Sequence, residues 1–190
     1  YKVKCALGKR GIGLKRREGD LITPKGTFKI KQIFYRYDRI KKLETSIKKY
    51  KINKKMGWCN DTNSKYYNKL VKYPFSFKSE NLYRKDNIYD IILVLNYNMS
   101  PTKKKKGSAI FLHVSKNNYS DTEGCVAIRK KDLRKLLKKI TNGDMAVGDV
   151  IVVGAAAIVE ADVDDDIRLI EVNATSNAFQ AGEEYEIMGF

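Results

Sequence analysis

Two short apolar runs constrain the fold of this chain more than any other feature of its sequence. Residues 89–95 form one mostly apolar run of strand length, and residues 108–113 form another, which ends at His113, the only histidine. Runs of this length without polar alternation are typical of central strands that are buried on both faces. The sequence therefore predicts a buried β-sheet at the centre of the fold.

Shorter β-like runs and one helix are predicted around these two strands. Residues 1–7 alternate as a strand does, and residues 27–31 resume that pattern after two clusters of turn residues. In residues 131–140 the apolar side chains recur at the spacing of one helix face, and Asn142-Gly143 is a fitting stop signal. We therefore expect residues 1–142 to be mostly β with one or two helices.

Two stretches between the predicted strands carry no clear periodic pattern. Residues 38–55 are too charged to assign, and residues 57–85 are polar and aromatic, which favours a long surface loop. With 190 residues, the chain is long enough for one ordinary domain and a small appendage. It contains no apolar run long enough for a transmembrane helix, so no membrane span is predicted.

The net charge of the chain changes sign after residue 142. Residues 1–142 hold 37 Lys and Arg against 11 Asp and Glu, whereas residues 143–190 hold one Arg against 11 acidic residues. The basic surplus has two explanations that the sequence leaves open. One is a compositional bias towards Lys, Asn, Ile and Tyr, and the other is a surface that attracts an anionic polymer.

The acidic residues 143–190 are predicted to form a small β-rich segment, which is either a tail or an appended module of unknown role. Its β-like runs are residues 149–153 and 167–172. The first run is also placed to be the last strand of the preceding domain, which then extends to about residue 153. Docking of a partner onto this segment, or its self-association, is the interaction that we expect of it.

Cys125 has the sequence neighbours of a nucleophile. Gly124 leaves room for a substrate to approach the sulfur and the local N–H groups, and the apolar residues 126–128 would fix its position. His113 ends a predicted strand twelve residues earlier and is the only imidazole available as a base. A cysteine after glycine is also common as a small core residue, so these features alone leave catalysis and packing both open.

The three cysteines also allow other roles. Cys5 and Cys59 can form a disulfide that leaves Cys125 as a thiol, which suits an exported protein, or all three can stay reduced. Three cysteines at these separations and one histidine lack the paired spacing of a zinc site, so we expect no metal site.

His113 followed by residues 122–127, Thr-Glu-Gly-Cys-Val-Ala, resembles the signature of the L,D-transpeptidase (YkuD-type) catalytic domain. In that signature an upstream histidine pairs with a cysteine in a Gly-Cys-hydrophobic motif. The resemblance covers nearly all of residues 1–142. Further matching segments, in chain order, are Cys5-Ala6-Leu7-Gly8, Glu18-Gly19-Asp20, Thr23-Pro24-Lys25-Gly26-Thr27-Phe28, Gly57-Trp58-Cys59, Asp61, Tyr67-Asn68, Tyr89-Asp90 and residues 107–113.

This resemblance implies a sandwich- or barrel-like β fold in which the cysteine and histidine face one groove. It further implies acyl transfer on peptidoglycan stem peptides, with Cys125 as nucleophile and His113 as base. Backbone N–H groups near Gly124 would hold the oxyanion. No metal or organic cofactor is implied. The implied location is the periplasm, or a secreted protein bound to the cell wall, although no leader is visible in this chain.

The sequence departs from many members of the family at two positions. Those members carry histidine two residues before the cysteine and arginine two residues after it, whereas this chain has Glu123 and Ala127. The candidates for contacts with the substrate are Trp58, Tyr67, Asn68, Glu123 and Arg129. The three residues from 57–85 also suit packing of a long loop, and Glu123 also suits a turn. Arg129 is the nearest replacement for the absent arginine.

Other functions remain open at the level of sequence. Hydrolysis of the acyl-enzyme in place of cross-linking would make the protein an L,D-carboxypeptidase. A non-enzymatic alternative is a structural or virion-associated protein in which the acidic segment serves assembly. Another is a basic polymer-binding protein, but no nucleic-acid-binding motif accompanies the charge, so no specific nucleic acid is expected.

Overall fold

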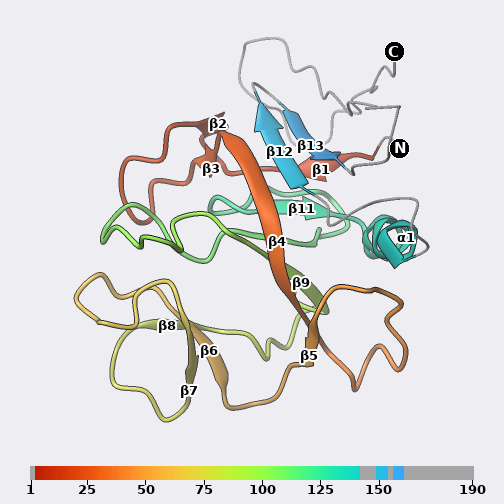
Figure 1. The fold of residues 1–190 in the computed structure, drawn as a ribbon, viewed down its shortest axis with the longest axis horizontal. Helices are drawn as coiled ribbons and strands as arrows, with labels where there is room; N and C mark the ends of the chain where they lie inside the picture. Colours follow the sequence, from red (N-terminus) through yellow and green to blue (C-terminus); the bar gives the residue numbers. More distant parts are fainter. Residues whose placement is uncertain (1–2, 142–148, 154–155, 161–190) are drawn as a thin grey trace.

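A large mixed β-sheet forms the centre of the computed structural model, which describes residues 3–141, 149–153 and 156–160. Its strands follow the order β1-β11-β10-β9-β4-β12-β13, and β5 pairs with the far half of β4 (Figure 1). The prediction of a mostly β fold with one clear helix is confirmed. The strands of this sheet are β1 (Cys5–Ala6), β4 (Gly26–Tyr35), β5 (Lys49–Lys51), β9 (Ile91–Leu95), β10 (Phe111–Val114), β11 (Val126–Ile128), β12 (Asp149–Val153) and β13 (Ala156–Glu160).

The two apolar runs of the sequence form β9 and β10, side by side and antiparallel at the middle of the sheet. Every residue of both strands is buried, as the absence of polar alternation predicted. Alternate residues of β9 serve different cores: Ile91 and Leu93 belong to the core on one face, and Ile92 and Val94 to the core on the other. The centre of the sheet is therefore covered on both sides.

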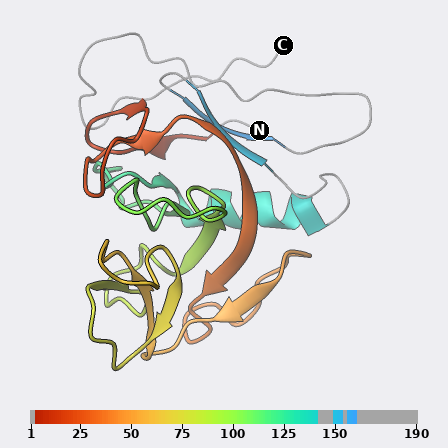
Figure 2. The same ribbon diagram turned by 60° about the vertical axis from the view of Figure 1, so that its left-hand side comes forward.

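Strand β4 carries a bulge that changes which of its residues face each core. Its pairing with β9 shifts by one residue between Ile30 and Gln32. Before the shift Phe28 and Ile30 face the first core, and after it Ile33 does so. An extra residue in one strand reverses the alternation, so Phe34 faces the second core. The single long strand β4 thus contributes side chains to both cores, and Figure 2 shows its course through the molecule.

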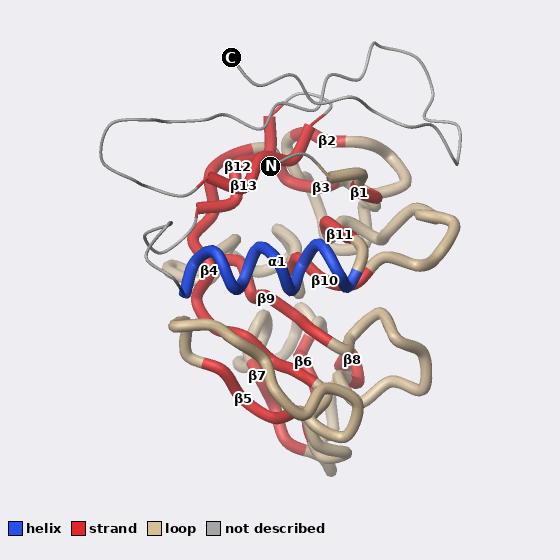
Figure 3. The backbone as a smooth tube through the Cα atoms, turned by 90° about the vertical axis from the view of Figure 1, so that its right-hand side faces the viewer, coloured by secondary structure: helices blue, strands red, loops and turns tan. Residues whose placement is uncertain are grey.

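Helix α1 (Lys130–Thr141) packs across the first face of the sheet, as Figure 3 shows. Leu133, Leu136 and Leu137 are buried, at positions that the sequence pattern predicted. Asp132 lies in the first turn, and Lys138 and Lys139 lie in the last, so the charges complement the helix dipole. The helix begins two residues after β11 ends, close to the segment that carries Cys125.

The expectation that residues 57–85 form a surface loop is wrong. They contain most of a second, antiparallel sheet of order β7-β6-β8, formed by β6 (Met56–Cys59), β7 (Leu70–Lys72) and β8 (Ser79–Asn81). Trp58 of β6 is buried against Phe34 and Phe111, on the second face of the large sheet. These strands are too short for their alternation to be recognised in the sequence. A third, two-stranded sheet pairs β2 (Ile12–Gly13) with β3 (Thr23–Pro24) in parallel.

The β-like run at residues 149–153 forms strand β12, which pairs antiparallel with β4 and extends the large sheet beyond residue 142. Strand β13 follows it as the outer partner. The predicted run at residues 167–172 lies outside the described residues, as does most of the acidic segment. Within the described part of the chain, no helix is long and apolar enough to cross a membrane.

Candidate active site

His113 of β10 and Cys125, the residue directly before the parallel strand β11, lie on the same face of the large sheet. In the pairing of β10 with β11, His113 is opposite Ala127 and Leu112 is opposite Val126. Because side chains alternate along a strand, Cys125, two residues before Ala127, shares that face with His113. The two positions are diagonal neighbours, with Cα atoms about 8 Å apart by standard strand geometry. The side chains are therefore within reach of one another.

A pocket of about 300 Å³ contains both residues in its lining. Much of one wall comes from residues 115–124, the crossover that joins β10 to β11, with contributions from Lys116, Asp121 and Glu123. A parallel pair of strands requires such a crossover, because the chain must return to the same end of the sheet before the second strand begins. The structure thus brings together Cys125, His113 and Glu123 from the set predicted by sequence.

The sulfur of Cys125 is held by the backbone of the segment that leads into β10. Its thiol donates to the Ala109 carbonyl at 3.2 Å, and its Sγ lies 3.4 Å from the Phe111 amide nitrogen, which donates to it. Two threonine hydroxyls, Thr122 at 2.6 Å and Thr23 at 3.3 Å, donate to the carbonyl of Cys125. Both the sulfur and the backbone of this residue are therefore held by hydrogen bonds.

Hydrogen bonding defines the orientation of the His113 ring. Its Nδ1 lies 3.0 Å from the carbonyl oxygen of Val114. Because a carbonyl only accepts, Nδ1 must carry the proton, which leaves the lone pair on Nε2. Tyr89 packs edge-on against the imidazole, with ring centroids 5.4 Å apart. Burial lowers the pKa of His113 to about 4, so the ring is neutral at pH 7.

The thiol is also neutral at rest. Burial raises the pKa of Cys125 to about 12, and the nearby carboxylate of Glu80 adds to the rise. The Tyr89 hydroxyl donates to Glu80 at 2.6 Å, and burial raises the pKa of Glu80 as well. A neutral thiol beside a neutral imidazole suits general-base activation, in which the proton moves as the sulfur attacks. It does not suit a preformed thiolate–imidazolium pair.

Gly124 has a backbone conformation and close neighbours that would strain any other residue at this position. Its φ is +135°, and a Cβ there would lie 2.9 Å from the Ile22 carbonyl oxygen and 3.2 Å from Lys15 Nζ. Its N–H donates to the Thr122 hydroxyl at 3.1 Å. In this state the Gly124 amide is therefore already engaged, and of the two amides expected to hold an oxyanion, that of Cys125 becomes the stronger candidate.

Trp58, Tyr67 and Asn68 do not line the pocket but support its wall. The side-chain Oδ1 of Asn68 accepts from Trp58 Nε1 and from the Ala109 amide, both at 3.0 Å. The Tyr67 hydroxyl donates to Glu18 and accepts from the Gly107 amide at 2.9 Å. Ala109 has a φ of +53°, an unusual value for alanine, and it is the residue whose carbonyl accepts from the Cys125 thiol. These residues are better described as positioning residues.

Replacing Asn68 by alanine is expected to lower the free energy of unfolding by about 3 kcal/mol, because the buried Trp58 N–H and the partly buried Ala109 N–H lose their acceptor. Urea denaturation followed by tryptophan fluorescence measures the change. Asn117→Ala, at an exposed asparagine, is the matched control and should change the value by less than about 0.5 kcal/mol. Equal effects of the two substitutions would contradict the supporting role of Asn68.

Arg129 lies outside the pocket. It is exposed, and its guanidinium stacks over the ring of Tyr119 at 5.2 Å. It therefore does not replace the arginine that many family members carry near the cysteine. Cys5 and Cys59 lie in different sheets and are not joined by a disulfide. No group of three or more potential metal-ligating side chains occurs among the described residues.

The pocket also contains charged residues that the sequence did not single out. Lys15, Glu80 and Arg84 line it together with Tyr89. Glu80 and Arg84 lie in the stretch that was expected to be a loop, and Lys15 is one of 38 basic residues in the chain. Their positions in the sequence give no signal for them, because they approach Cys125 only through tertiary packing.

One comparison with known proteins finds a match. The family model of the L,D-transpeptidase catalytic domain, YkuD, matches residues 1–153, a range that ends with strand β12. No curated protein sequence and no solved structure shows significant similarity to the chain.

Proposed function

Because this chain belongs to the YkuD family of L,D-transpeptidase catalytic domains, we propose that it is a cysteine acyltransferase that cross-links peptidoglycan stem peptides. The observation that carries the proposal is the placement of Cys125 and His113 on one face of the large sheet, in a single pocket. The family acts on peptidoglycan, which lies outside the cytoplasmic membrane. We therefore also place the protein in the periplasm or at the cell wall, with residues 1–153 as the catalytic domain.

In the proposed reaction, Cys125 Sγ attacks the carbonyl that joins the third residue of a tetrapeptide stem to the terminal D-alanine. His113 Nε2 accepts the thiol proton as the S–C bond forms, and then gives it to the departing D-alanine nitrogen as the C–N bond breaks. A thioester remains. An amine of a second stem attacks it, a new amide forms, and Cys125 recovers its proton through His113.

Product analysis tests this proposal. The protein is incubated with disaccharide tetrapeptides, and the products are separated by chromatography and weighed by mass spectrometry. We expect release of D-alanine and formation of a dimeric muropeptide. Disaccharide tripeptides alone are the matched control, because they lack the D-alanine that must leave, and they should give no dimer. A carbapenem should add its own mass to the protein.

Two other outcomes would change the conclusion. Release of D-alanine with only trimmed tripeptide product would mean that water takes the place of the acceptor amine, and the protein would be a carboxypeptidase. Absence of product and of carbapenem adduct from folded protein would contradict acyl transfer of either kind.

A further inference from the structure

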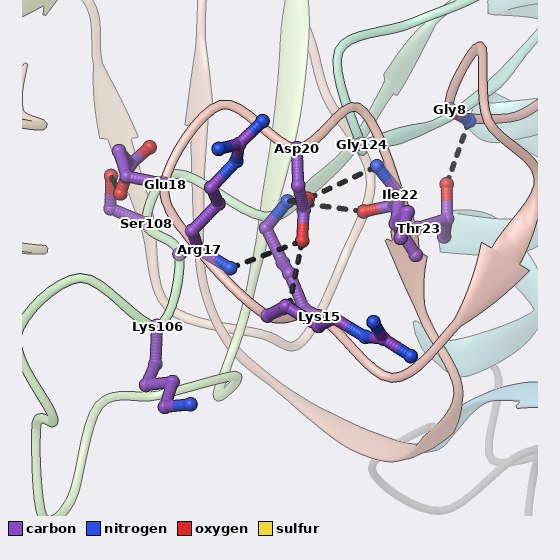
Figure 4. Close-up of polar contacts among 12 residues, drawn as sticks. Gly8, Lys15, Arg17, Glu18, Asp20, Ile22, Thr23, Lys106, Ser108 and Gly124 are labelled. Atoms are coloured by element: carbon purple, nitrogen blue, oxygen red, sulfur yellow. Dashed lines mark hydrogen bonds and ion pairs between the residues drawn. The ribbon is translucent and has the colours of Figure 1, made fainter.

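A buried ammonium group lies in the wall of the pocket beside the nucleophile. The side chain of Lys15 is only 2% exposed, and it lines the pocket that contains Cys125. Figure 4 shows its contacts with Asp20 and Ile22. Lysine is rarely buried to this extent, because its charge loses its hydration. The surroundings of this group therefore need an explanation.

Asp20 and the backbone around it hold the ammonium in place. Lys15 Nζ lies 2.5 Å from Asp20 Oδ1 and donates to the Ile22 carbonyl at 3.1 Å. The carboxylate of Asp20 also accepts the amides of Arg16 at 2.7 Å and Ile22 at 3.2 Å. Asp20 is thus saturated with donors, and it fixes both the loop and the cation.

Two glycines make room for the Lys15 side chain. A Cβ on Gly107 would lie 2.4 Å from Lys15 Cε, and a Cβ on Gly124 would lie 3.2 Å from Lys15 Nζ. Both glycines have a positive φ, +98° and +135°. The aliphatic part of the Lys15 side chain therefore passes Gly107, and its ammonium group lies against the backbone that immediately precedes Cys125.

The ammonium retains a donor for a further partner. It has three N–H groups, and the hydrogen bonds that the described residues make with it use two, to Asp20 and to Ile22. Such a buried ion pair contributes little net stability compared with apolar packing, so stability alone does not explain why a lysine stands here. A negative charge in the pocket would satisfy the third N–H.

We propose that Lys15 stabilises the negative charge that develops on the substrate carbonyl oxygen during acylation, which makes it a catalytic residue beyond Cys125 and His113. This inference rests on the proposed function. As the sulfur attacks, the C=O π electrons move to oxygen, which accepts the third N–H of Lys15 together with the Cys125 amide. When the carbonyl re-forms, the electrons return and the C–N bond breaks. Lys15 keeps all its protons throughout.

The electrostatics of the site agree with this geometry. Although burial raises the pKa of Cys125, the charge of Lys15 acts in the opposite direction and favours negative charge at the cysteine. A positive charge that Asp20 and the Ile22 carbonyl already fix in place requires little reorganisation during the reaction, which is the condition for strong stabilisation of an oxyanion.

Three variants test the role of Lys15: Lys15→Met, Asp20→Asn and the double variant Lys15→Met/Asp20→Asn. The measurements are the second-order rate of carbapenem acylation, followed by intact-protein mass spectrometry, and the thermal unfolding midpoint. Lys15→Met is expected to slow acylation by about 100-fold or more. It should also lower the unfolding midpoint, because Asp20 is left as an unpaired buried charge. The double variant should recover much of that midpoint but not the acylation rate.

A second measurement separates this role from a structural one. The rate of alkylation of Cys125 by iodoacetamide, which forms no oxyanion, should fall much less than the acylation rate in the double variant. Lys25→Met, at an exposed lysine nearby, removes the same charge and should leave both rates unchanged. If the Met variants do not fold, Lys15→Gln replaces them, because glutamine keeps an N–H donor for the Ile22 carbonyl.

The outcomes distinguish this inference from the function on which it rests. Recovery of the acylation rate in the double variant would overturn the role of Lys15, because the cation would then matter only as the partner of Asp20. An acylation rate close to wild type in Lys15→Met or Lys15→Gln would overturn it equally. A wild-type protein that forms no adduct would instead contradict the proposed function itself.

Discussion

Replacing Cys125 by alanine is expected to abolish the covalent adduct with a carbapenem and to reduce turnover of tetrapeptide stems by at least about 10⁴-fold. The sulfur is the only proposed point of attachment for the acyl group, and alanine keeps the backbone contacts of the site. The Thr122 and Thr23 hydroxyls donate to the Cys125 carbonyl, which the substitution retains. Intact-protein mass spectrometry measures the adduct, and circular dichroism checks the fold.

The matched control is the pair of substitutions Cys5→Ser and Cys59→Ala, which removes both other thiols and keeps Cys125. Neither of these cysteines lines the pocket, so the control should form the adduct in full. An adduct that persists in Cys125→Ala, or one that is lost in the control, would move the nucleophile to another residue.

Replacing His113 by alanine is expected to slow acylation by about 10³-fold at pH 7, because the thiol then lacks a base that can remove its proton. The loss should depend on pH. Burial raises the pKa of Cys125 to about 12, so the thiolate fraction of the variant is small at neutral pH. Its rate should rise about tenfold per pH unit as that fraction grows.

The wild-type rate should have a different profile. Protonated imidazole cannot accept the thiol proton, and the pKa of His113 is lowered to about 4 by burial. The acylation rate should therefore stay level above about pH 5 and fall as pH decreases through about 4, well below the usual range of histidine. Stopped-flow acylation from about pH 3.5 to about pH 9, a range that includes the lowered pKa of His113, measures both profiles. Parallel profiles for wild type and His113→Ala would contradict a role as base.

The parts of the fold that the sequence predicted are those governed by local periodicity. Strands β9 and β10 were recognisable because burial on both faces leaves no polar position in them. Helix α1 was recognisable because Leu133, Leu136 and Leu137 recur at helical spacing. The second sheet was missed because strands of three or four residues are too short to show an alternation.

The residues of the candidate site also fall into two groups, those that a local sequence motif predicts and those that it does not. Cys125 and His113 could be proposed from a short motif, whereas Lys15 could not, because its burial depends on contacts with Gly107 and Gly124, about 90 and 110 residues away in the chain. The supporting role of Asn68 was equally hidden, since its partners at Trp58 and Ala109 come together only through packing. A sequence pattern reflects residues that are close along the chain, whereas Lys15 and Asn68 contact residues that are close only in the folded structure.

The parallel pairing of β10 with β11 has a consequence for how specificity can change in this architecture. The crossover from residue 115 to residue 124 places Cys125 beside His113, and several of its side chains also line the pocket. Two of its residues, Lys116 and Asp121, are exposed and carry opposite charges. Substitution of these two residues would change the charge of the pocket wall, while the strands keep Cys125 and His113 in register. If the proposed function holds, the choice of acceptor and the bond chemistry depend on separate parts of the fold and can change independently.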